Sequence, residues 1–492
     1  MNQKKAPWHF LLLLVLAGES VFILPFVLSR VFRPTVLEVF GLDNLQLGLC
    51  FSVYGIVALV SYLFGGPLAD KFPPRKMIAV ALWMTALGGL VYATFPSYTV
   101  LKILYGYWGF TTIFLFWAPM IKATRIWGGP TSQGRAFGFL DGGRGLVGAL
   151  FGTLGVLIFS LFITSDISEI TVTESRAAFR QVILVSSGIV VLVGLLVWFF
   201  MKLDRKTEKE VILEKISIPQ ILEVLRLPSV WLLMIIILCA YVGYKITDVF
   251  SLYAQDVMLY NQVQSAQVGT FLLFIRPIVG VLIGLFSTRS KNTPWLVLGF
   301  VISFLGALLF ALGLISDSAP ILFFISILIV ATGVYAARSL YFAVMEKGRI
   351  PIVLTGTAVG LISLIGYTPD IFAGPAMGYL LENSPGPTGH QHVFWMLALF
   401  SFIGGIAAWY YFRLYRHKET ALKNFLRPTI LEARPNGTGR GGQSHRDTSL
   451  PVGRPASRQA GFAPRQFGID FTSPSPNASE AKMAVLTSPK ER

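Results

Sequence analysis

The chain has 492 residues, of which 54% are hydrophobic and only 13% are charged. Soluble proteins carry about 25% charged residues, so this composition leaves too little charge to cover a surface that faces water. The net charge of +16 does not indicate nucleic-acid binding, because the excess lysine and arginine lies in short loops between apolar runs and in the segment after residue 413.

The long apolar runs predict an all-α, polytopic membrane protein. A helix of about 20 residues crosses the hydrocarbon core of a bilayer, and it satisfies its own backbone hydrogen bonds there. Twelve segments have the required length and apolar composition: 8–30, 44–66, 77–95, 99–121, 136–162, 179–201, 229–254, 266–288, 294–315, 320–343, 352–381 and 392–412.

The loops between these segments predict the orientation of the chain. With the N-terminus in the cytoplasm, the inner loops before residue 413 hold eighteen lysines and arginines and the outer loops hold five, among them Arg30 and Arg33. Positive charge accumulates on the cytoplasmic side of membrane proteins. We therefore expect a multi-pass protein of the cell (inner or plasma) membrane with both termini in the cytoplasm.

The connection between the sixth and seventh segments divides the chain. We expect an N-terminal six-helix half over 1–201, a cytoplasmic linker with an amphipathic helix over 202–228 and a C-terminal six-helix half over 229–413. From there the composition turns to Gly, Pro, Ser and Arg, so 414–492 is expected to be a disordered cytoplasmic tail.

The loop between the second and third segments carries the most specific motif, Gly65-Gly66-Pro67-Leu68-Ala69-Asp70-Lys71-Phe72-Pro73-Pro74-Arg75-Lys76. It resembles the major facilitator loop signature G-x-L-A-D-R-x-G-R-[RK], with Pro73 in place of the usual glycine and Pro74 in place of the first basic residue. The resemblance implies two pseudo-symmetric six-helix halves that alternate in access around a midplane site. It also implies a gating role for Gly66, Asp70, Lys71 and Arg75.

Two further stretches resemble branches of the same superfamily. The stretch 117–138 resembles the fourth-to-fifth helix region of organic-anion and sugar-phosphate transporters. The runs 346–351 and 367–370 resemble a bacterial subgroup of putative transporters. The first of these resemblances implies a small anionic substrate.

Eight charged side chains fall inside the predicted spans: Glu19, Asp141, Arg144, Lys245, Asp248, Arg276, Arg338 and Asp370. A charge at the centre of a bilayer costs about 2.5–3.5 kcal/mol on insertion scales, and such residues usually face a bundle interior or a water-filled cavity. Spacing of three residues within Asp141/Arg144 and Lys245/Asp248 allows each pair to neutralise itself within its helix. Glu19 and Arg276 have no partner at helical spacing, and Arg338 falls near the cytoplasmic end of its segment.

Arginine presents a planar fork suited to carboxylate or phosphate, and a carboxylate in the membrane can bind and release protons. The candidate substrate-binding residues are Arg144, Arg276, Lys245, Tyr241, Trp117 and Tyr367. The candidate proton-coupling residues are Glu19, Asp141 and Asp370.

The sequence thus predicts a secondary transporter, acting as a monomer in the lipid bilayer, that takes up a small organic anion with H⁺. A drug or metabolite exchanger or efflux pump remains an alternative, and a sensor with a transporter fold is a third. No cofactor, metal or nucleic-acid partner is expected. No paired catalytic constellation indicates an enzyme.

Overall fold

The computed structural model describes residues 7–128, 133–163, 171–201, 218–286, 292–341, 343–344, 355–384 and 386–431. Helices and their connecting turns make up all of these residues, with no strand among them. The chain divides into a compact unit, Met1–Thr429, and a second unit, Ile430–Arg492, of which only the first two residues are described.

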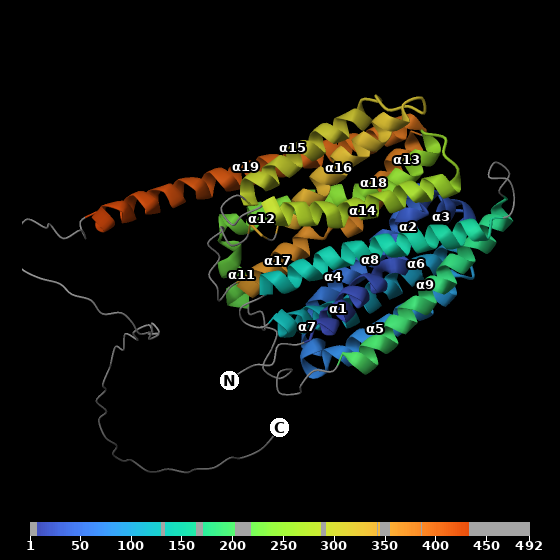
Figure 1. Ribbon diagram of the computed structural model, residues 1–492, viewed down its shortest axis with the longest axis horizontal. Helices are drawn as coiled ribbons and strands as arrows, with labels where there is room; N and C mark the ends of the chain where they lie inside the picture. The colour runs from blue at the N-terminus through green and yellow to red at the C-terminus, as the bar shows by residue number, and fades with distance from the viewer. Residues whose placement is uncertain are drawn as a thin grey trace, which may run out of the picture. The chain divides into compact units, whose positions relative to one another are not determined.

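The helices of the first half follow the predicted order (Figure 1). Their bounds are α1 (Trp8–Phe22), the π-helical η1 (Ile23–Val27), α2 (Leu28–Val31), α3 (Arg33–Phe40), α4 (Asn44–Lys71), α5 (Pro74–Tyr92), α6 (Tyr98–Gly109), the π-helical η2 (Phe110–Trp117), α7 (Ala118–Gly128), α8 (Gln133–Leu161) and α9 (Val172–Phe200).

The second half begins after a short helix, α11 (Ile218–Leu225), which covers the end of the predicted linker. Its bounds are α12 (Pro228–Ile246), η3 (Thr247–Val249), α13 (Phe250–Asp256), α14 (Gln262–Phe286), α15 (Asn292–Ala311), α16 (Pro320–Leu340), α17 (Thr355–Gly366), α18 (Pro369–Asn383) and α19 (Pro387–Leu431).

The described helices account for all twelve predicted spans. Ten helical stretches among the described residues are long and apolar enough to cross a membrane. The other two spans are α5, with 19 residues, and the pair α17–α18, which is interrupted before Pro369. Proline has no backbone N–H to donate, so Pro369 cannot continue the hydrogen bonds of α17, and the eleventh span is broken into two shorter helices there. The predicted all-α polytopic fold is confirmed.

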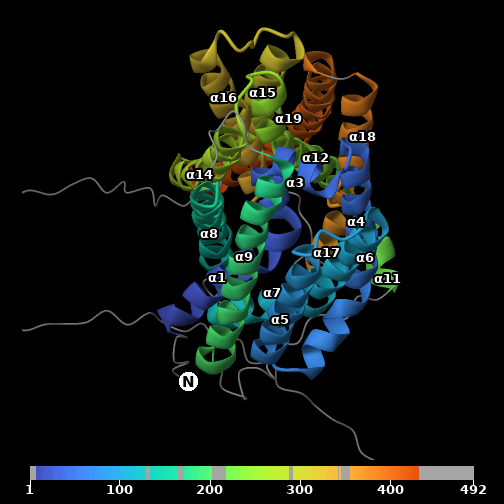
Figure 2. The same cartoon turned by 90° about the vertical axis from the view of Figure 1, so that its right-hand side faces the viewer.

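The hydrophobic core is divided along the sequence. One cluster of buried residues draws on 10–201 with two contributions from α14, and two further clusters draw on 224–411. The two groups of helices meet where α4 packs on α18 and α8 packs on α14 (Figure 2). These two seams leave space between the groups for a central cavity.

The α4–α18 seam depends on glycine. A Cβ atom on Gly48 would lie 2.4 Å from the carbonyl oxygen of Gly374, and one on Gly378 would lie 2.5 Å from that of Asn44. Small residues let helix backbones approach closely inside a membrane, where packing is the main source of helix association. The backbones of the two helices are therefore in direct contact along this seam.

Two predicted segments differ from the structure or fall outside it. The helix α19 continues to Leu431, so 414–431 is helical where composition predicted disorder. Residues 432–492 lie outside the described part of the chain, as does 202–217, which holds most of the predicted linker.

We predict that Gly48→Ala destabilises the protein, because the added methyl meets backbone that cannot rotate away. Overpacking of this kind costs about 1–3 kcal/mol. Gly188→Ala in α9 is the matched control, since nothing lies within 4 Å of its Cβ position. Thermal unfolding in detergent measures the melting temperatures of both variants. Equal melting temperatures for the two variants would contradict a tight α4–α18 seam.

Candidate functional site

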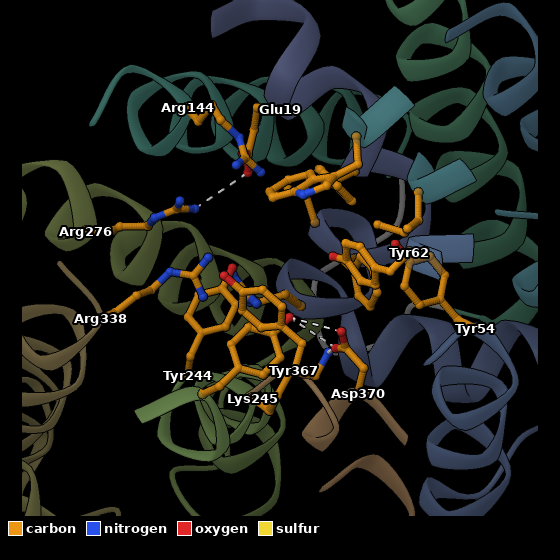
Figure 3. Close-up of a pocket in the computed structure, with 17 residues that line it drawn as sticks. Glu19, Tyr54, Tyr62, Arg144, Tyr244, Lys245, Arg276, Arg338, Tyr367 and Asp370 are labelled. Carbon is orange, nitrogen blue, oxygen red and sulfur yellow. Dashed lines mark hydrogen bonds and ion pairs between the residues drawn. The ribbon is translucent and has the colours of Figure 1, made fainter. Parts of the chain in front are cut away.

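A cavity lies between the two groups of helices, and its wall draws on η1, η2 and the helices on both sides (Figure 3). Both π-helical segments contribute aromatic side chains to it, Phe26 from η1 and Trp117 from η2. Single π turns inside membrane helices often occur at functional sites, because the extra residue redirects side chains. Among the described residues, seven charged side chains line the cavity, namely Arg30, Arg144, Lys245, Arg276, Arg338, Glu19 and Asp370.

One group of charges, the Glu19 cluster, joins α1, α8 and α14. The Glu19 carboxylate lies 3.3 Å from Nε of Arg144, without hydrogen-bond geometry, and 3.8 Å from Nη1 of Arg276. Nη2 of Arg276 donates to Asp141 at 3.0 Å. The hypothesis that Asp141 and Arg144 neutralise each other within one helix is wrong, because each forms its ion pair with another helix. Arg276 therefore links the second half of the chain to two carboxylates of the first.

Glycines make room for these side chains. A Cβ atom on Gly148 would lie 2.9 Å from Oε1 of Glu19, and one on Gly18 would lie 3.0 Å from Cδ of Arg144. The glycine at position 148 of α8 therefore leaves space for the buried carboxylate of Glu19.

A second group, the Asp370 cluster, joins α12, η3, α18 and α2. Nζ of Lys245 lies 3.2 Å from Asp370 and 4.0 Å from Asp248. The hydroxyl of Tyr241 donates to Asp370 at 3.2 Å. Arg30 donates to Asp248 and forms a buried ion pair with it. Lys245 is thus paired mainly with a different helix, and Asp248 is paired mainly with the first half of the chain.

Two cations of the wall were missed or misplaced by the sequence analysis. Arg30 was assigned to an outer loop, but it lies in α2 with 4% of its surface exposed. Arg338 was placed near the cytoplasmic end, yet it reaches the cavity. Both stack on the ring of Tyr244, Arg338 at 3.7 Å from the ring centroid and Arg30 at 4.5 Å. Their shared contact has no signal in the sequence, because Tyr244 lies in a third helix, α12.

Aromatic side chains also line the cavity, and Tyr62 and Tyr54 lie across it from Arg276 and Arg338 (Figure 3). The ring of Tyr62 lies 6.4 Å from those of Trp117 and Tyr367, and Tyr367 lies 4.9 Å from Tyr241. The structure therefore brings the three predicted aromatic candidates, Trp117, Tyr241 and Tyr367, to the cavity. It adds Tyr62, which was not predicted.

Polar side chains join the two halves at the end of the bundle where α3 and α13 lie (Figure 1). Gln262 donates to Glu38 and accepts from Ser175 at 3.1 Å. Asn44 accepts from Arg33 at 2.9 Å, and its backbone N–H donates to Glu382 at 2.8 Å.

Partial burial raises the pKa of the Glu38 carboxyl, and the hydrogen bond from Gln262 opposes the rise. At the end of the bundle where α3 and α13 lie, the hydrogen bonds of Gln262 and Asn44 cross between the halves and bridge the cavity.

The predicted gating motif lies apart from the cavity, at the junction of α4 and α5. Lys71 ends α4 with an exposed side chain, and the side chain of Arg75 is partly buried. Nζ of Lys122 in α7 donates to the carbonyl of Ala69 at 3.1 Å, which ties the junction to the fourth span. Gly66 and Asp70 lie in α4, and the surroundings of Gly66 and the side chain of Asp70 lie outside the described part of the structure.

Two groups of membrane helices around a central charged cavity define the architecture of a secondary transporter. The model of the Major Facilitator Superfamily matches residues 10–373 of the chain. The chain belongs to this superfamily. It is a multi-pass membrane transporter that works by alternating access, and its family is one of transporters rather than enzymes.

Individual relatives agree with this assignment. The inner membrane protein YqcE of Escherichia coli (strain K12) is 28% identical over 421 residues, covering 84% of this chain and 96% of YqcE. The inner membrane protein YihN of the same organism is 27% identical over 415 residues, covering 82% and 95%.

Solved structures of a bacterial homologue of the human lysosomal transporter Spinster share the fold. The inward-facing, occupied form has a TM-score of 0.62 at 18% identity and covers 84% of this chain and 98% of that one. The inward-facing, unoccupied form has a TM-score of 0.63 at 17% identity, covering 83% and 97%.

We predict that Arg30→Met lowers the free energy of unfolding by about 3–5 kcal/mol, because it removes the nearest cationic partner of the buried Asp248 and leaves only Lys245 at 4.0 Å. The double variant Arg30→Met/Asp248→Leu should recover most of the loss, since an apolar pair can replace a buried ion pair. Thermal unfolding of the two variants in detergent tests this. A double variant that is less stable than the single one would contradict the pairing.

Proposed function

We propose that the protein takes up a small organic anion together with protons. The observation that carries this proposal is the charge of the cavity wall. Five cations line it against two carboxylates, Glu19 and Asp370, among the described residues. An excess of fixed positive charge in a low-dielectric cavity attracts anions and repels cations. A cationic drug, the cargo of many efflux pumps, fits this wall poorly.

The ion pairs suggest how the anion and the proton are coupled. An anion that binds Arg144 and Arg276 competes with Glu19 for the same guanidinium groups. A carboxylate that loses its cationic partner inside a membrane is costly, and proton uptake removes the charge. Substrate binding at the Glu19 cluster therefore favours a protonated Glu19.

Two further carboxylates, Asp141 and Asp370, are also paired with cations and can take part in proton coupling. Asp141 shares Arg276 with Glu19, and half of its side-chain surface is exposed, which gives protons access from water. Asp370 holds Lys245 in the second half of the chain. We assign proton coupling to these three carboxylates. Glu19 is the one that competes directly with the anion for the arginines.

Alternating access requires the halves to separate at one end at a time. With both termini in the cytoplasm, the end bridged by Gln262 and Asn44 faces outward and is closed in this structure. The loop of Gly66, Asp70, Lys71 and Arg75 lies at the opposite, cytoplasmic end and acts there as a gate. The two Escherichia coli relatives are named inner membrane proteins, and we place this monomeric transporter in the same membrane.

Tracer uptake into proteoliposomes tests the coupling. We predict that a pH gradient, acid outside, drives accumulation of the anion by the unaltered protein. Glu19→Gln should retain exchange of labelled for unlabelled anion but lose accumulation driven by the gradient, because the introduced amide cannot carry the proton.

Asp317→Asn is the control, since Asp317 is exposed and its carboxylate accepts only from a local backbone N–H in the described residues. Accumulation by Glu19→Gln at the level of this control would refute the assigned role of Glu19. If the unaltered protein accumulates the anion equally well with and without the pH gradient, proton coupling is refuted altogether.

A further inference from the structure

Arg338 differs from the other cations of the cavity wall in having no carboxylate partner among the residues that the structure describes. Arg30, Arg144, Lys245 and Arg276 each form an ion pair. Among the described residues no such pair involves Arg338, and its Nη1 is buried without a hydrogen bond. A charged donor left unsatisfied in a buried place costs more free energy than a neutral one. Within the described part of the chain, the Arg338 guanidinium therefore has a buried N–H group, Nη1, with no partner.

The surroundings of Arg338 orient it toward the cavity. Its guanidinium lies over the ring of Tyr244 at 3.7 Å and near that of Tyr241 at 5.6 Å from the centroid. The Tyr244 hydroxyl is already occupied, because it accepts from Arg30 at 2.9 Å. Tyr244 supports one face of the guanidinium, and the edge that carries the N–H groups points into the cavity beside Arg276 (Figure 3).

The acid that could satisfy Arg338 is engaged elsewhere. Asp141 is electrostatically coupled to Arg338, but its carboxylate bonds Arg276 at 3.0 Å. Anions that bind arginine in proteins favour the planar, two-pronged edge of the guanidinium. The missing partner of Arg338 is therefore best supplied by a carboxylate, phosphate or sulfonate group that enters from the cavity.

The aromatic part of the cavity wall indicates what this group is attached to. Tyr62, Trp117 and Tyr367 present ring faces and edges to the cavity. The hydroxyl of Tyr62 has no hydrogen bond within the described chain, while that of Tyr367 lies 3.4 Å from the hydroxyl of Tyr341. Aromatic faces with polar tips bind rings, either by stacking or against the C–H face of a sugar.

We propose that Arg338 binds the anionic group of the substrate and that Tyr62, Trp117 and Tyr367 bind a ring attached to it. This proposal rests on the proposed function and narrows it from small organic anions to ring-bearing ones. Arg338 then sets specificity for the charge and the aromatic wall sets specificity for the ring. A linear anion of equal charge occupies only half of the site.

Thermal unfolding and equilibrium binding with defined probes test the two parts of the site, the contact with the anionic group and the contact with the ring. The ring-bearing anions are glucuronate, glucose 6-phosphate and benzoate. Acetate and inorganic phosphate provide the charge without a ring, and glucose provides a ring without charge. A ligand at 100 times its dissociation constant stabilises a protein by about 2.7 kcal/mol. We expect at least one ring-bearing anion to raise the melting temperature, and the three other probes to leave it unchanged at the same concentration.

Variants then test whether Arg338 is the residue that binds the anionic group. Arg338→Gln should weaken binding of the stabilising anion by roughly tenfold to a hundredfold, the range expected for a lost hydrogen bond to a charged group. Its ligand-free melting temperature should not fall, because the substitution removes an unpaired charge. Arg276→Gln should lower that temperature, since it leaves Asp141 without its partner. Arg413→Gln is the matched control, an exposed arginine that stacks on Trp409 in α19 and not in the cavity wall.

The outcomes separate the two proposals. Binding of a ring-bearing anion that survives Arg338→Gln unchanged overturns the role of Arg338 and leaves anion transport standing. Equal stabilisation by acetate or inorganic phosphate, or binding that survives Tyr62→Leu, overturns the ring subsite. Stabilisation by none of the anions, or by glucose alone, overturns both the subsite and the anionic substrate.

Discussion

The structure depends on one constraint, which is that a charge held inside a membrane must be neutralised by a partner. Insertion scales put the cost of such a charge at about 2.5–3.5 kcal/mol per residue, and the chain carries many of them at the centre of its bundle. The helices are arranged so that nearly every cavity charge meets an opposite one from another helix. The glycines of α8 and α1 serve the same end, since they leave space for Glu19 and Arg144.

The ion pairs also divide into two kinds with different consequences for movement. Arg144 with Glu19, and Lys245 with Asp370, join helices of the same half. These pairs can travel with their half as a rigid body. Arg276 with Asp141, and Arg30 with Asp248, join helices of different halves.

Any motion that separates the halves around the cavity must break or exchange this second kind of pair. An anion and a proton are the two agents that can replace the lost partners, one for the arginines and one for the carboxylates. In the mechanism that we propose, the charge balance of the cavity thereby links substrate binding to the change of access.

The sequence predicted the fold nearly completely, because the length and apolar character of a membrane span are local properties. All twelve spans appear where the apolar runs placed them, including α5 and the pair interrupted before Pro369. The embedded charges could also be predicted, since a charged residue inside an apolar run is easily recognised. The loop motif identified the superfamily before any packing was known.

Pairing between helices could not be predicted, because it depends on rotation and tilt that a single sequence does not encode. Spacing of three residues suggested Asp141 with Arg144, whereas the structure pairs each with a different helix. Arg30 was read as a loop residue because it ends an apolar run, although the helix continues through it. Arg338 was judged by its depth along α16 alone, and its reach into the cavity comes from a long side chain supported by Tyr244.

The most direct test is calorimetric titration of the purified protein with its stabilising anion, repeated in buffers of different ionisation enthalpy. The dependence of the observed heat on the buffer gives the number of protons bound with each anion. If the anion displaces Glu19 from its arginines, linkage requires uptake of up to about one proton per anion at a pH where Glu19 is otherwise ionised. Binding without proton uptake at any pH would show that the anion does not compete with a carboxylate, and it would contradict the proposed coupling.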